Sequence, residues 1–118
     1  MRDDRVYLLH IRDAVRRILD YTGAGRDAFL SDPMTQDAAV RNLEVIGEAA
    51  KNLSPGFRDA HPEIPWKPMA GMRDRLIHEY FGVDLELVWQ VVERELPEIV
   101  SRIESILEPS DSDPELDG

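Results

Sequence analysis

The stretch from residue 73 to residue 80 places an arginine, a histidine and a tyrosine close together in a small protein without cysteine. Histidine is the side chain most readily used for proton transfer near neutral pH. Arginine carries a permanent charge on a planar group that fits a phosphate. Arg73 and His78 would therefore supply a cation and a proton carrier, the minimum needed to cleave RNA without a metal ion.

The spacing of these residues has consequences if the stretch is a helix that continues to about Phe81. Asp74 and His78, four residues apart, would share a face, so the carboxylate could hold the imidazole and favour its charged form. Arg73 and His78 would lie about 140° apart around the helix, and Arg73 and Tyr80 would be nearly eclipsed. Spacing alone favours the alternative of ordinary surface charges and a half-buried histidine, because R-x4-H arises easily by chance.

Two longer runs give this stretch a context. The run 69–84, which contains Arg73 and His78, resembles the signature of the HEPN superfamily and specifically of its HepT-like toxins. The run 42–51 resembles the second helix of the same family, and the resemblance covers roughly residues 4–107. It implies a small all-α homodimer that acts as a metal-independent RNase, with Arg73 and His78 as the catalytic pair.

The same resemblance implies a partner and a point of control. Many such toxins are paired with a minimal nucleotidyltransferase, an antitoxin that adds AMP to the tyrosine of the motif, here Tyr80. One position departs from the family pattern, because Asp74 stands where these toxins often have asparagine. Aspartate keeps the capacity to orient the histidine but adds negative charge where a phosphate would approach.

The composition predicts one globular domain, residues 1–107, followed by a disordered acidic tail, residues 108–118. The absence of cysteine, of a long apolar stretch and of a signal peptide fits a cytoplasmic protein without a membrane span. The net charge is −10, and the tail supplies 5 of the 24 acids. The rest of the chain has 14 basic and 19 acidic residues, a charge of −5, which argues against binding duplex DNA broadly.

The spacing of apolar residues predicts an all-α up-and-down bundle of four main helices. These helices are expected at residues 4–22, 33–53, 69–81 and 85–107. Pro97 should kink the last one, because it removes a backbone donor and crowds a carbonyl group. Gly47 costs its helix about 1 kcal/mol relative to alanine, which suggests a close helix crossing. Trp89 either marks an interface or fills the core near Tyr7.

Glu44 and Glu48 lie on one face of the second helix, where pairing with nearby basic residues is the ordinary expectation. The alternative is that one carboxylate faces the motif helix and binds Arg73 or His78. We favour Glu48 for this supporting role, because the neighbouring Gly47 indicates a closely packed face.

No metal site or cofactor is expected from the sequence. The chain has no H-E-x-x-H motif and no glycine-rich phosphate loop between a strand and a helix. His10 is expected to be a packed or surface residue, and His61 precedes a proline in a loop without an evident role.

RNA cleavage of this type needs both a general base and a general acid, and one chain offers a single motif histidine. A two-fold homodimer would bring two copies of His78 and Arg73 into one cleft. The competing hypothesis is a helical binding module that partners a nucleotidyltransferase without cleaving anything. The acidic charge and Asp74 favour this second hypothesis slightly.

Overall fold

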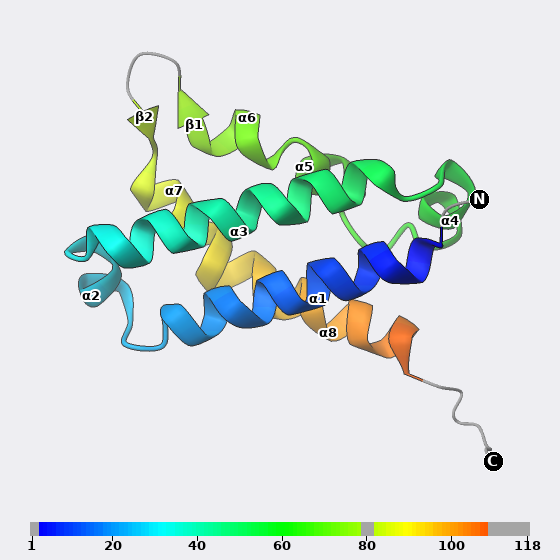
Figure 1. The fold of residues 1–118 in the computed structure, drawn as a ribbon, viewed down its shortest axis with the longest axis horizontal. Coiled ribbons are helices and arrows are strands. Elements are labelled where there is room, and N and C mark those ends of the chain that lie inside the picture. Colours follow the sequence, from blue (N-terminus) through cyan, green and yellow to red (C-terminus); the bar gives the residue numbers. More distant parts are fainter. Residues whose placement is uncertain (1–2, 79–81, 109–118) are drawn as a thin grey trace.

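The computed structural model describes residues 3–78 and 82–108. These residues form the predicted all-α up-and-down bundle, with one short β pairing added. Its central pair is α1 (Asp4–Tyr21) and α3 (Pro33–Asn52), which lie side by side in opposite directions, with the short α2 (Arg26–Leu30) between them (Figure 1). Asp32 begins α3 as expected, because its carboxylate accepts a hydrogen bond from the Met34 backbone N–H.

The chain then returns along α3 in short helices. α4 (Pro55–Ala60) turns the chain, and α5 (Trp66–Ala70) and α6 (Met72–Leu76) run along the outer side of α3 (Figure 1). Gly71 separates α5 from α6, yet its N–H donates to the Lys67 carbonyl of α5 and its carbonyl accepts from the Arg75 N–H of α6, so the two form an almost continuous rod.

The last predicted helix is continuous but not uniform. It consists of α7 (Leu85–Gln90), a π-helical segment η1 (Val91–Glu95) and α8 (Leu96–Leu107). Asp84 begins α7 and accepts a hydrogen bond from Leu87 N–H. The expected distortion before Pro97 takes the form of this wider turn, because a proline lacks the N–H for a regular helical bond and crowds the carbonyl four residues earlier.

One shared hydrophobic core lies between these helices. It is formed by side chains that are almost fully buried, among them Ile11, Ile18, Phe29, Leu43, Ile46, Met69, Met72, Leu76, Leu96 and Ile103. The sequence left open whether Trp89 marks an interface or fills the core near Tyr7; its ring packs against Phe29 at the core, with ring centroids 5.7 Å apart. The apolar stripes predicted from the sequence therefore meet in a single core.

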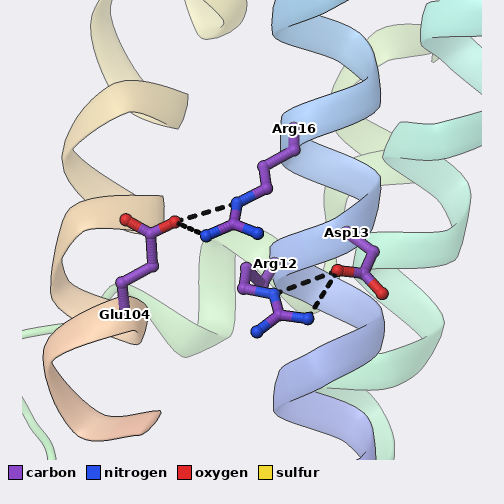
Figure 2. Close-up of polar contacts among 4 residues, drawn as sticks. All are labelled: Arg12, Asp13, Arg16 and Glu104. Carbon is purple, nitrogen blue, oxygen red and sulfur yellow. Dashed lines mark hydrogen bonds and ion pairs between the residues drawn. The ribbon is translucent and has the colours of Figure 1, made fainter. Parts of the chain in front are cut away.

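One surface ion pair joins α8 to α1 on the side shown in Figure 2. The Arg16 guanidinium binds the Glu104 carboxylate, with Nε donating over 2.9 Å, and this contact spans 88 residues of sequence. One turn earlier on α1, Arg12 binds its neighbour Asp13 instead. Because these groups are largely exposed, each pair contributes at most about 1 kcal/mol to stability.

The helix predicted to continue to Phe81 ends at Leu76, so this prediction is wrong. Ile77 has an extended backbone (φ −116°, ψ 120°), and β1 (Ile77–His78) pairs antiparallel with β2 (Gly82–Val83). Ile77 and Val83 pack against the core, and Asp84 N–H donates to the Leu76 carbonyl over 2.8 Å. Gly82 has a φ of +75°, which favours glycine. Core packing, strand pairing and the conformation of Gly82 therefore end the helix earlier than the apolar periodicity predicts.

Two predictions fall on residues that the structure does not describe. Tyr80, expected to lie two turns above Arg73 on one helix, is outside the described residues, as is the acidic tail from residue 109 onward.

The close crossing predicted at Gly47 is confirmed. A Cβ atom at Gly47 would lie 3.2 Å from the Met69 carbonyl oxygen and 3.6 Å from that of Ala70. The backbone of α5 thus rests directly on α3, and a side chain at position 47 would push it away.

We expect Gly47→Leu to lower the free energy of unfolding by about 1–3 kcal/mol, the usual cost of overpacking. Urea denaturation followed by circular dichroism measures this. Gly56→Leu is the matched control, because nothing lies within 4 Å of a Cβ atom there, so it should not lower stability. Equal stability of the two variants would show that the crossing is not closely packed.

Candidate functional site

Arg73 is held at the surface by its buried neighbours on α6. Met72 and Leu76 point into the core, which turns Arg73 and Asp74 toward solvent. The Arg73 side chain is 67% exposed although the helix that carries it is firmly packed. A cation displayed on a fixed element can receive a phosphate without first being ordered.

The partner of Arg73 is Glu44 on α3, whose carboxylate accepts a hydrogen bond from the guanidinium. The sequence had suggested Glu48 for this contact. Glu48 instead lies one turn further along α3 and is 3.6 Å from Lys51. The carboxylate that orients Arg73 is therefore that of Glu44.

His78 follows Arg73 by five residues but belongs to a different element. It ends β1, opposite Gly82, and its side chain is exposed. The contact expected between Asp74 and His78 depended on a continuous helix, and no hydrogen bond or ion pair joins them among the described residues. The structure thus carries Arg73 on a packed helix and His78 on the short strand β1 that follows it.

Arg75 has a role that the sequence did not indicate. Its half-buried guanidinium donates two hydrogen bonds to the Glu95 carboxylate, over 3.2 and 3.0 Å, and so joins α6 to η1. No short-range pattern could have revealed this pair, because the two residues are 20 apart and Glu95 lies in the π-helical segment. Arg75 is an anchor for α6 and not part of the exposed site.

A cleft of about 420 Å³ lies next to Arg73 and is enclosed by α1, α3 and the rod formed by α5 and α6. Its polar lining includes His10 from α1, Arg41, Glu44 and Glu48 from α3, and Arg73 from α6. The sequence placed His10 among ordinary packed or surface residues, since nothing local to it indicates that α1 crosses beside the motif. Among the residues that sequence analysis proposed, the cleft brings together Arg73 and Glu48 but not His78.

Within residues 3–78 and 82–108, no three histidine, aspartate or glutamate side chains gather closely enough to hold a metal ion. No helix in those ranges has the length and apolar character needed to cross a membrane. The described site offers two kinds of chemistry. The Arg73 guanidinium can bind an anion, and the exposed His78 imidazole can transfer a proton.

Comparison with known proteins gives a consistent result. The model of the family described as "Ribonuclease HepT-like" matches residues 11–106. "Putative RNase TTE0752" of Caldanaerobacter subterraneus is 43% identical over 92% of this chain and 97% of its own length. "Putative RNase MJ0127" of Methanocaldococcus jannaschii is 42% identical over 97% of this chain and 95% of its own. "Probable ribonuclease HepT" of Thermococcus cleftensis is 43% identical, over 89% and 96%. No solved structure matches this chain significantly.

The contrast between Arg75 and Arg73 predicts different effects on stability. Arg75→Ala should lower the free energy of unfolding by about 1–2 kcal/mol, because it removes a half-buried guanidinium and both of its hydrogen bonds to Glu95. Arg73→Ala should cost less than about 1 kcal/mol, because the Arg73 guanidinium is 67% exposed and solvent weakens its pair with Glu44. Denaturant titration of both variants measures this, with Glu95→Gln as a control that should not add to the effect of Arg75→Ala. A larger effect at Arg73 would contradict the assignment of Arg75 as the anchor.

Proposed function

Because the chain belongs to the HepT-like ribonuclease family, we propose that it is a metal-independent endoribonuclease in which Arg73 and His78 carry out cleavage. The observation that supports this most is the exposure of Arg73 beside a polar cleft while its neighbours on α6 are buried. His78, five residues later, is likewise exposed on the adjoining strand.

The proposed reaction transfers a phosphoryl group within the RNA. The ribose 2′-oxygen attacks the adjacent phosphorus, the bond from phosphorus to the 5′-oxygen breaks, and a cyclic phosphate and a free 5′-hydroxyl result. An imidazole takes the proton from the 2′-hydroxyl, and an imidazolium gives a proton to the leaving oxygen. The Arg73 guanidinium stabilises the negative charge that gathers on the phosphate oxygens.

Two proton transfers are served most simply by two histidines. We propose a two-fold homodimer in which both copies of His78 and Arg73 face a common cleft, one imidazole acting as base and the other as acid. The position of His78 on a strand arm that extends beyond the bundle, visible in Figure 1, would let it reach toward a second subunit.

The predicted supporting residues keep proposed roles. Asp74 is exposed beside Arg73 and would orient His78 once substrate or a second subunit is present. Glu48 lines the cleft. Glu44 holds Arg73 in the free protein and would release it to the phosphate, an exchange that costs little because the Arg73 guanidinium is largely exposed.

We further propose that the protein is a cytoplasmic toxin, neutralised when a minimal nucleotidyltransferase antitoxin adds AMP to Tyr80. Only one residue separates Tyr80 from His78 in sequence, so a nucleotide attached there would bring a phosphate near the proposed catalytic groups. Such a group resembles the substrate and would block the site by its size and charge.

The second candidate is a helical partner of a nucleotidyltransferase that cleaves nothing. The net charge of −10 and the carboxylate of Asp74 beside Arg73 favour it. A partner enzyme fits both candidates, so RNA cleavage distinguishes them.

His78→Ala and Arg73→Ala should each reduce RNA cleavage by at least about 10²-fold, since each removes a group that acts in the transition state. Cleavage of a fluorescent RNA in the presence of EDTA measures this. Circular dichroism should show unchanged helical content, and sedimentation should give a particle of twice the 13.5 kDa chain mass.

His61→Ala is the matched control for the loss of an imidazole, because His61 lies in the loop after α4, outside the cleft lining. It should cleave like the parent protein. Cleavage by both His78→Ala and Arg73→Ala at the parent rate in EDTA would reject the ribonuclease mechanism, and no cleavage by the parent protein would favour the second candidate.

Tyr80→Phe should prevent neutralisation by the nucleotidyltransferase while leaving cleavage intact, because it removes only the hydroxyl that would accept AMP. Mass spectrometry after incubation with the partner enzyme and ATP should show AMP additions on Tyr80 of the parent protein and none on Tyr80→Phe. Tyr7→Phe and Tyr21→Phe are the matched controls and should still be modified. Modification of Tyr80→Phe at the parent level would exclude Tyr80 as the acceptor.

A further inference from the structure

The cleft beside Arg73 has an aromatic wall on its α1 side. Tyr7 and His10 lie one turn apart on α1, and their rings meet edge to face with centroids 6.2 Å apart. Both residues line the cleft, and His10 is exposed. Exposed aromatic faces in a recess are the usual platforms on which proteins stack unpaired bases.

The opposite side of the cleft carries positive charge. Two of its basic residues are engaged, since Arg73 binds Glu44 and Lys51 lies 3.6 Å from Glu48. Arg41, which is exposed one turn before Glu44, makes no ion pair or hydrogen bond with any residue that the structure describes. Because the chain is acidic overall, an unpaired guanidinium in a recess marks a local place for an anion.

The interior of the cleft is open because its lining includes residues with small or no side chains. Gly47 and Ala49 on α3 and Ala70 at the end of α5 leave the volume of about 420 Å³ that larger residues would fill. Pockets of this size suit small organic ligands, whereas a duplex could not enter.

We propose that this cleft binds one unpaired nucleotide of single-stranded RNA next to the bond that is cut. Its base stacks on the His10 ring, with the perpendicular Tyr7 ring beside it, and its phosphate is held by Arg41. This rests on the proposed ribonuclease function and adds a substrate class to it. Arg73 lies on the same rim, so a strand that places one nucleotide in the cleft brings the neighbouring phosphate to the proposed catalytic cation.

Stacking is tested with paired changes in protein and RNA. Binding is measured by fluorescence anisotropy with the cleavage-deficient His78→Ala protein, using short single-stranded RNAs in which each nucleotide in turn is made abasic. At one position next to the cleavage site, loss of the base should raise Kd about tenfold. In the His78→Ala protein, His10→Ala should also raise Kd about tenfold. The abasic change should then have no further effect on Kd, as expected if the base contacts His10 directly.

His10→Tyr separates stacking from proton transfer. It keeps an aromatic face without an imidazole, so it should bind the intact RNA within about twofold of His10 and remain sensitive to the abasic position. In the protein that retains His78, His10→Ala should raise KM with little change in kcat. A fall in kcat that His10→Tyr does not rescue would overturn the proposal, because His10 would then act in proton transfer.

The phosphate contact is tested by salt dependence. Arg41→Ala should weaken RNA binding several-fold and reduce the slope of log Kd against log salt by about 0.7, the value for one contact with a single strand. Arg94→Ala is the matched control, because Arg94 is 76% exposed on η1 and does not line the cleft. It should leave the slope unchanged.

The outcomes distinguish a failure of the nucleotide subsite from a failure of the proposed ribonuclease function. If His78→Ala abolishes cleavage but the His10 and Arg41 variants bind every RNA like their parents, the nucleotide subsite is wrong and the proposed function stands. If His78→Ala cleaves normally, the proposed function fails first. Tighter binding of duplex than of single-stranded RNA would also reject the subsite.

Discussion

The rest of the site depends on one close contact. The backbone of α5 packs against α3 at Gly47, where α3 has no side chain. Because no side chain separates the two elements, α5 and α6 lie close against α3, and Glu44 is within reach of Arg73. The same approach sets one wall of the cleft, where Ala70 faces α3. A side chain at position 47 would move α5 and α6 outward. Glycine lowers the stability of α3 at this position, but it allows the close packing that forms the site.

Much of the fold could be predicted from the sequence because the responsible signals are local. Apolar periodicity gives α1 and α3, and Asp32 and Asp84 begin their helices through bonds within three residues. The end of the motif helix at Leu76 could not be predicted in this way. Ile77 and Val83 are strand residues and not helical ones, because they pair with each other and pack on the core, and such tertiary contacts leave no local pattern.

The site shows the same division between local and long-range information. Arg73 and His78 are recognisable from their types and order along the chain. The identity of the carboxylate that meets Arg73 is not, because Glu44 and Glu48 share one helix face and only the exact placement of α6 chooses between them. The bond from Arg75 to Glu95 and the arrival of His10 at the cleft arise from elements that are distant in sequence and therefore leave no local pattern.

The ion pairs of the cleft explain how an acidic chain could handle an anionic substrate. Arg73 and Lys51 are held near carboxylates, so the surface presents little net positive charge from a distance and does not attract nucleic acid broadly. Such exposed pairs are worth at most about 1 kcal/mol, so a phosphate that offers a better fit to the guanidinium can displace Glu44 at small cost. Arg41, unpaired among the described residues, would make the first contact. Selectivity would then come from the fit of one strand segment to the recess, and the acidic remainder of the surface would repel the segments that do not fit.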